Sequence, residues 1–151
     1  MSLFNGLNIS ASGLTANRLR MDVVSSNIAN ANSTRAELVN GEWVPYRRKS
    51  VQLTQSEISP FQHQLQTAIG KGNSQISGVS VSAIEEDRAP FVQTYDPTNA
   101  DANEEGYVQS PNVDPIKEMV DLMSATRSYE ANVTALNASK SMFMKALEIG
   151  K

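Results

Sequence analysis

Few side chains in this sequence could act as an acid, a base or a nucleophile. The 151 residues include one histidine, His63, and no cysteine. A single histidine in a Gln-rich stretch, with no cluster of carboxylates beside it, is usually a surface residue and not a base or a metal ligand. The lack of cysteine excludes disulfides, thiolate zinc sites and thiol catalysis. We therefore expect no catalytic residue, no cofactor and no metal site.

One acidic stretch resembles a calcium-binding loop. Positions 1, 3, 5 and 6 of the loop pattern are occupied by oxygen-bearing residues and a glycine, namely Asp101, Asn103, Glu105 and Gly106. Position 12 would be Asn112, where the pattern requires a bidentate Glu. Asp96-Pro97 also interrupts any helix that would lead into the loop. An acidic turn is the better explanation of this stretch.

The charges do not indicate a polyanion partner. The formal net charge is −3, and the basic cluster that stands out is Arg47-Arg48-Lys49. A nucleic-acid-binding protein usually carries a larger basic patch or stripe. We interpret the basic triplet as the solvated edge of a strand or loop, and the acidic run Glu85-Glu86-Asp87 as a solvated turn. We expect no nucleic-acid partner.

Two asparagines near the end of the first helical segment have two possible roles. Asn27 and Asn30 lie in the run Ser-Asn-Ile-Ala-Asn-Ala-Asn. Asparagine near a helix end can bond its own backbone, which is a local structural role. A buried asparagine can also bond across to a second helix and fix the register of the pair. The sequence favours neither explanation over the other.

Residues 1–33 have the periodicity of a helix with one apolar seam. Apolar side chains recur every seven residues at Leu7, Leu14, Met21 and Ile28. Gly6 and Gly13 weaken this helix, each by roughly 1 kcal/mol relative to alanine. The helix therefore needs a partner that buries its seam.

Residues 115–151 predict a second, longer helix. Asp114 is a good N-cap, Pro115 suits the first helical position, and Gly150 suits the end. A second seam repeats every seven residues, with two further members four residues later: Leu122, Tyr129, Leu136, Phe143, Val133 and Leu147. A helix of about 35 residues is roughly 52 Å long. A chain of this size cannot cover such a helix by itself, so part of each seam is left for other chains.

The sequence predicts that the middle of the chain, residues 40–110, is β-rich. Alternation predicts strands around Val51-Gln52-Leu53, over Val79–Ala83 and over Phe91–Tyr95. Residues 55–78 predict a long loop, and residues 96–112 a connection into the last helix. We therefore predict a mainly α fold with a small β lobe (α+β). The two terminal helices pair as a coiled-coil-like core, and the middle segment is looped out as a separate lobe.

No export or membrane signal is recognisable. The start of the sequence, Met-Ser-Leu-Phe-Asn-Gly-Leu-Asn, lacks a charged region followed by a continuous apolar stretch, so we expect no cleaved signal peptide. No apolar run approaches the roughly 18 residues of a membrane-spanning helix, so we expect no membrane insertion.

Both ends of the sequence resemble the flagellar axial proteins, the family of rod, hook and hook-associated subunits. The N-terminal resemblance lies in Ala11–Leu14, Arg20–Ser25 and Asn27–Asn30. Further motifs resemble one proximal-rod subfamily: Pro45–Lys49, Tyr95–Pro97, Gly106–Val108, Pro111–Asp114, Glu118–Asp121, Arg127–Val133 and Lys145–Gly150.

The resemblance implies a structural subunit of the bacterial flagellar basal body. Such a subunit would leave the cytoplasm through the flagellar type III export apparatus and lie across the periplasm or cell wall. Its partners would be copies of itself, other rod proteins and basal-body components, and it would transmit motor torque to the hook and filament. It would not be an enzyme.

The periodic residues and the resemblance together predict an assembly interface made of the two seams, with Asn27 and Asn30 beside them. Its members are Leu7, Leu14, Met21, Asn27, Ile28, Asn30, Leu122, Tyr129, Val133, Leu136, Phe143 and Leu147. An alternative function is a cytoplasmic helical adaptor or export chaperone. A cell-wall hydrolase would need a pair of carboxylates in a cleft, for which the sequence offers no convincing candidates.

Overall fold

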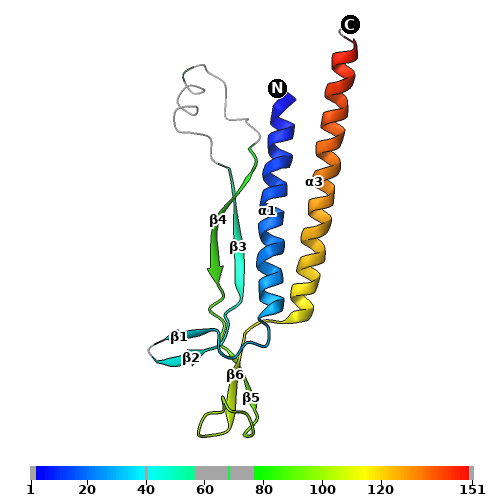
Figure 1. The fold of residues 1–151 in the computed structure, drawn as a ribbon. Helices are drawn as coiled ribbons and strands as arrows, with labels where there is room; N and C mark the ends of the chain where they lie inside the picture. The colour runs from blue at the N-terminus through cyan, green and yellow to red at the C-terminus, as the bar shows by residue number, and fades with distance from the viewer. Residues whose placement is uncertain (1–2, 40, 57–67, 69–76, 150–151) are drawn as a thin grey trace.

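Two long antiparallel helices form the body of the molecule. The computed structural model describes residues 3–39, 41–56, 68 and 77–149. Helix α1 spans Leu3–Ala29 and helix α3 spans Pro115–Ile149, and the two run side by side in opposite directions (Figure 1). Short antiparallel hairpins make up the strands between them. The predicted α+β fold, with paired terminal helices and a β-rich middle, is confirmed.

Helix α3 begins as the sequence predicts. The Asp114 carboxylate accepts hydrogen bonds from the backbone N–H of Ile116 at 2.9 Å and of Lys117 at 3.3 Å. These bonds satisfy two of the N–H groups that lack an intrahelical partner, which is the function of an N-cap. Helix α1 ends at Ala29 rather than near residue 33. The Asn30 side chain bonds back to the Ser26 carbonyl at 2.9 Å, and a tight turn follows.

The closest approach of the two helices uses small residues. A Cβ placed on Gly6 would lie 3.9 Å from the Ser139 hydroxyl, and one on Gly13 would lie 3.1 Å from the Asn132 amide. Ala125, seven residues before Asn132, is fully buried. Small side chains at these positions let the two backbones come close. The predicted seam residues lie near them on α3, and nine of the ten apolar seam residues are partly buried.

The strands form three separate two-stranded hairpins. Strands β1 (Glu37–Val39) and β2 (Glu42–Val44) pair first, then β3 (Lys49–Gln55) with β4 (Val79–Glu86), and then β5 (Val92–Tyr95) with β6 (Tyr107–Ser110). Gly41, with a φ of 91°, lies in the first turn, and Gly106, with a φ of 82°, precedes β6. Both are left-handed conformations that glycine adopts without steric cost.

The three predicted strands are confirmed as β3, β4 and β5, but the sequence analysis missed the others. The prediction of a plain connection over residues 96–112 is wrong, because Tyr107–Ser110 forms β6 opposite β5. The strand β6 is only four residues long and is specified by its pairing with β5, not by its own alternation. Most of the loop predicted over residues 55–78 lies outside the described residues.

The hairpin of β3 and β4 packs against α1, on the side away from α3 (Figure 1). The Ser12 hydroxyl accepts a hydrogen bond from the backbone N–H of Val79 at 3.1 Å. The other two hairpins extend beyond the lower end of the helix pair (Figure 1). The middle segment is thus one hairpin laid along α1 and two hairpins beyond it, not wholly a lobe apart from the helices.

The core is thin. Apart from two prolines, the buried apolar side chains in the described part of the chain are Ala16, Val23, Val24, Val108 and Ala125. All five are small, whereas many larger apolar side chains are exposed. Burial of small side chains stabilises a fold only modestly. Among the described residues, larger apolar side chains such as Trp43, Met123 and Leu147 stay exposed.

Candidate assembly surface and the polar cluster at its base

A buried polar cluster joins the two helices to the first long strand. Its members are Asn27, Tyr46, Arg48, Asn112 and Glu118. The Asn27 amide donates to the Glu118 carboxylate at 2.8 Å and to the Lys49 carbonyl at 2.8 Å. The Asn27 side-chain oxygen accepts from the Lys49 N–H and from the Tyr46 hydroxyl, each at 3.0 Å. The Asn27 amide group therefore binds α1 to both α3 and β3.

Arg48 completes the cluster from the strand side. Its Nε donates to the Glu118 carboxylate at 2.6 Å, and its other guanidinium nitrogens lie 3.6 Å from Asp121 and 3.9 Å from Asp87. Glu118 is fully buried, whereas the Arg48 side chain is 19% exposed. A buried carboxylate is costly unless it is paired and hydrogen-bonded, and Glu118 is both.

Asn112 holds the segment that enters α3. Its side-chain oxygen accepts from the backbone N–H of Arg48 at 2.8 Å, and its amide donates to the carbonyls of Asp87 and Ala89. Among the described residues, no buried side-chain nitrogen or oxygen lacks a hydrogen-bond partner. A fully satisfied network of this kind fixes one arrangement of the elements that it joins.

The sequence left two explanations open for Asn27 and Asn30, a bond to a second helix or a local bond, and each explanation holds for one of them. Asn27 bonds across to the second helix, while Asn30 bonds its own helix at Ser26 and accepts from the Ser33 hydroxyl at 3.3 Å. Every hydrogen-bonding atom of Asn27 is used inside the chain, and its side chain is fully buried. Any contribution of Asn27 to assembly must therefore act through the position of the helices.

The sequence analysis missed Arg48 and Glu118. Arg48 was interpreted as part of a solvated strand edge, and Glu118 was given no role outside the resemblance. The seven-residue spacing along α3 could have indicated that Glu118 faces α1. Glu118 precedes the buried Ala125 by seven residues, and Asn132 and Ser139 follow at the same spacing, so all four lie on the face of α3 that meets α1.

The structure leaves the predicted apolar seam residues partly or largely uncovered. Nine are partly buried, namely Leu7, Leu14, Met21, Ile28, Leu122, Tyr129, Val133, Leu136 and Phe143. The Thr126 hydroxyl lies 3.5 Å from the Met21 sulfur, which places Met21 against α3. Leu147, near the end of α3, is 70% exposed. The chain alone does not cover these side chains, and their role in assembly stays a prediction.

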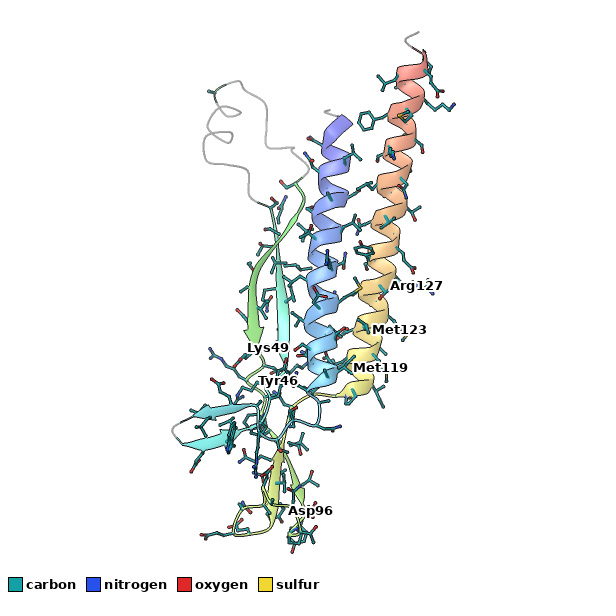
Figure 2. All side chains as sticks on the ribbon, viewed as in Figure 1. Tyr46, Lys49, Asp96, Met119, Met123 and Arg127 are labelled. Carbon is teal, nitrogen blue, oxygen red and sulfur yellow. The ribbon has the colours of Figure 1, made fainter. Side chains whose placement is uncertain are left out.

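The outer face of α3 carries a further apolar surface that the sequence analysis did not identify. Ile116, Met119, Val120 and Met123 are 71%, 50%, 55% and 61% exposed. They lie at positions i, i+3, i+4 and i+7, which is one stripe on a helix. Figure 2 shows Met119 and Met123 on the lower half of α3, followed by Arg127. We call these four residues the outer stripe.

The acidic stretch around residues 101–106 forms a turn, and groups of the same chain donate hydrogen bonds to its side-chain oxygens. The Asp101 carboxylate accepts from the Thr34 hydroxyl at 2.8 Å and from Arg35, whose hydrogen bond holds the pKa of Asp101 below its ordinary value of 3.8. The Asn103 oxygen accepts from the backbone N–H groups of Glu105 at 3.1 Å and Tyr107 at 2.8 Å. No group of three or more potential metal ligands occurs in the described ranges.

No helix in the described part of the chain is long and apolar enough to cross a membrane.

The shallow cavities at the junction of helices and strands are lined by mixed polar and apolar groups. One of about 420 Å³ is lined by Asp22, Val23, Ser26, Tyr46, Lys49, Ile84 and Glu86.

Two family models match the helical ends of the chain. The model described as "Flagella basal body rod protein" matches residues 7–36, and that described as "Flagellar basal body rod FlgEFG protein C-terminal" matches residues 104–149. The matched ranges contain most of α1 and the whole of β6 and α3. Both matches thus fall on the segments that form the helix pair and the exposed face of α3.

Curated relatives match along the full length. The flagellar basal-body rod protein FlgC of Bacillus subtilis is 63% identical over 151 residues, with 100% of each chain covered. FlgC of Borreliella burgdorferi is 41% identical over 159 residues, covering 99% of this chain and 98% of that one. FlgC of Salmonella typhimurium is 40% identical over 151 residues, again with 100% of each covered.

Proposed function

Because the chain belongs to the FlgC family of flagellar basal-body rod proteins, we propose that it joins the rod through the faces of its two terminal helices. The chain is a structural subunit of the rod and not an enzyme, and it assembles with other rod and basal-body components. The alternative of a cytoplasmic adaptor or export chaperone has no support, since the relatives named above are rod proteins.

The observation that carries this proposal is the mismatch between long helices and a thin core. Nine seam residues are only partly buried, and the buried apolar side chains of the described chain are all small. Contact with neighbouring subunits would remove the remaining apolar surface from water, at about 25 cal/mol per Å². A contact between different faces of successive subunits does not close on itself, so it extends into a helical tube.

The finer features of the proposal follow from the same role. The subunit would leave the cytoplasm unfolded through the flagellar type III export apparatus, without a cleaved signal peptide. It would lie across the periplasm or cell wall and contact copies of itself as well as other rod proteins. The polar cluster supports the torque-bearing role, because Asn27, Arg48 and Glu118 tie the hairpin to both helices. A load applied to the hairpins would then reach the helices.

Amide hydrogen exchange tests the proposal. Exchange would be measured by mass spectrometry on the isolated chain and on the same chain in purified basal bodies. We expect the amides of residues 3–29 and 115–149 to exchange faster in the isolated chain, because assembly buries their flanks. The amide of Val108, which is already buried, is the internal control and should change little.

Two outcomes would contradict the proposal. Equal protection of both helices in the isolated chain and in the basal body would mean that assembly buries no helical surface. Absence of the chain from purified basal bodies would contradict the rod function itself. The two outcomes are independent, because the first concerns the surface used and the second concerns the location of the chain.

A further inference from the structure

A cavity of about 500 Å³ lies among the hairpins, away from the helix pair. Its walls come from residues 34–35, from β2 with the proline that follows it, and from residues 101–109. The hairpins that carry these walls extend beyond the lower end of the helices (Figure 1). None of its described lining residues belongs to the polar cluster or to the predicted seams. Its volume is in the range of small-molecule sites, roughly 300–1,000 Å³.

The walls of this cavity are joined to each other. The Thr34 hydroxyl and the Arg35 guanidinium both donate to the Asp101 carboxylate, so the segment before β1 is bound to the segment before β6. On the second wall, the side-chain oxygen of Asn103 accepts from the backbone N–H of Tyr107 at 2.8 Å. The lining is therefore held in place before any ligand arrives, which lowers the entropic cost of binding.

Two aromatic side chains line the cavity. Trp43, the only tryptophan of the chain, is 55% exposed, and Tyr107 is 41% exposed. The Tyr107 ring meets the Tyr95 ring edge to face, with 5.3 Å between the centroids. The exposed face of an aromatic ring carries a partial negative charge and attracts C–H groups of a ligand that stacks on it.

The unused hydrogen-bonding groups of the cavity are neutral amides. Within the described part of the chain, neither the Asn103 amide nitrogen nor the Gln109 side chain has a hydrogen-bond partner, and both residues are exposed. Gln109 lies on the same face of β6 as Tyr107, since the buried Val108 separates them. A primary amide offers both donors and an acceptor, which is what a hydroxyl group requires.

The cavity carries little net charge. Arg35 and Asp101 neutralise each other, which leaves Glu42 as the remaining charge among the described lining residues. Phosphate and carboxylate ligands would face this carboxylate without a free cation to bind them. The composition therefore favours an uncharged ligand that has an apolar face and a polar edge.

We propose that this cavity binds a pyranose ring of an uncharged glycan. A pyranose presents C–H groups on its face, which stack on Trp43, and hydroxyls on its edge, which bond the amides of Asn103 and Gln109. The site is a property of the isolated chain and does not depend on the rod function proposed above.

A proline-rich peptide is the competing occupant. Such peptides also stack on exposed aromatic side chains in shallow grooves. A polyproline segment has no N–H or O–H group along its backbone, so it would leave the acceptor of the Gln109 amide without a donor. The free amides therefore favour the sugar, and a direct comparison of the two ligands decides between them.

Binding would be measured on the full chain with three probes: N,N′,N″-triacetylchitotriose, cellotriose and a proline decamer. Because Trp43 is the only tryptophan, its fluorescence reports on this cavity, and saturation-transfer NMR observes the bound probe directly. We expect at least one saccharide to change the Trp43 fluorescence saturably, in the millimolar range, and to receive saturation at its ring protons. A response to the chitotriose alone would support an acetamido sugar as the ligand, and a response to cellotriose would support the plain ring. No response to either saccharide, or a response to the proline decamer alone, would overturn the proposal.

Three substitutions show whether the saccharide occupies this cavity. Trp43→Ala and Gln109→Ala should each weaken binding in the NMR experiment by about fivefold or more, because stacking or a hydrogen bond is lost. Gln55→Ala changes an exposed glutamine at the end of β3, outside the lining of the cavity, and should bind as the unsubstituted chain does. Circular dichroism would confirm that each variant is folded, and if Trp43→Ala is not, Gln109→Ala still tests the site. Equal binding by Gln109→Ala and Gln55→Ala would overturn the cavity as the binding site and leave the rod function standing.

Discussion

The side-chain amide of Asn27 donates to the carboxylate of Glu118 at 2.8 Å, and both side chains are fully buried. The bond joins residues 91 positions apart, from the last turn of α1 to the first turn of α3. Since Arg48 donates to the same carboxylate, the ends of both helices and the start of β3 meet at one group. This group sets where the hairpins lie relative to the helix pair.

Replacing Glu118 should destabilise the fold strongly. In Glu118→Ala, Asn27 loses one acceptor and Arg48 loses its closest carboxylate, although Arg48 keeps Asp87 and Asp121 nearby. Removing one partner of a buried ion pair costs about 3 kcal/mol or more. We expect a lower melting temperature by about 10 °C in circular dichroism.

A surface carboxylate on the same helix provides the control. Glu130 pairs with Arg127, and its side chain is 56% exposed. An exposed pair of this kind contributes about 0–1 kcal/mol, so Glu130→Ala should change the melting temperature little. Equal effects of Glu118→Ala and Glu130→Ala would show that the buried cluster does not stabilise the fold.

A double-mutant cycle should show that Asn27 and Glu118 are coupled. Asn27→Asp keeps the side-chain shape but removes both donors and places a carboxylate beside that of Glu118. In Asn27→Asp with Glu118→Gln, an amide again faces a carboxylate. The double variant should therefore be less destabilised than the sum of the single variants, by about 1 kcal/mol or more in urea unfolding. Simple additivity would contradict a direct interaction in solution.

The pKa of Asp101 should depend on Arg35. The hydrogen bond from Arg35, together with that from the Thr34 hydroxyl, lowers the pKa of Asp101 from its ordinary value of 3.8. A carboxyl whose folded pKa is lowered stabilises the fold above its ordinary pKa, and this contribution is lost as the pH falls through the folded value. The effect is therefore confined to pH values below about 4.

Carbon-13 NMR titration of the carboxyl groups tests this dependence. In Arg35→Gln, the pKa of Asp101 should rise towards 3.8. In Arg88→Gln, which removes an exposed arginine two residues after the end of β4, the Asp101 titration should not change. An unchanged titration in the Arg35 variant would mean that this ion pair does not form in solution.

The local features of the fold were predictable, and the contacts between distant segments were not. Asp114 identified the start of α3, and alternation identified β3 and β4, because capping and alternation depend on neighbouring residues. Strand β6 has only four residues, and its pairing with β5 decides its structure. Glu118 looked like a surface charge, since nothing near it in the sequence shows that Asn27 and Arg48 bury it.

Two glycines in α1 should respond differently to alanine. Alanine is a better helix former than glycine by about 1 kcal/mol, so Gly6→Ala should stabilise the chain, because its Cβ would be in ordinary contact with Ser139 at 3.9 Å. A Cβ on Gly13 would be only 3.1 Å from the Asn132 amide, which is itself held by a bond to Ser128. Gly13→Ala should gain less or lose stability in urea unfolding. Equal gains would mean that the helices are farther apart in solution.

Leu136→Asp should abolish incorporation into the rod if the predicted seams form the assembly surface. Leu136 is partly buried, and a charge there would have to be desolvated when a neighbouring subunit packs against it. Asn137→Asp adds the same charge at the next residue, which is exposed, and should be incorporated normally. Motility and basal-body composition would be measured for both, with circular dichroism of each isolated chain to detect loss of helix. Normal motility of the Leu136 variant would count heavily against the seams, whereas lost incorporation with an intact helical signal would place Leu136 at a contact between subunits.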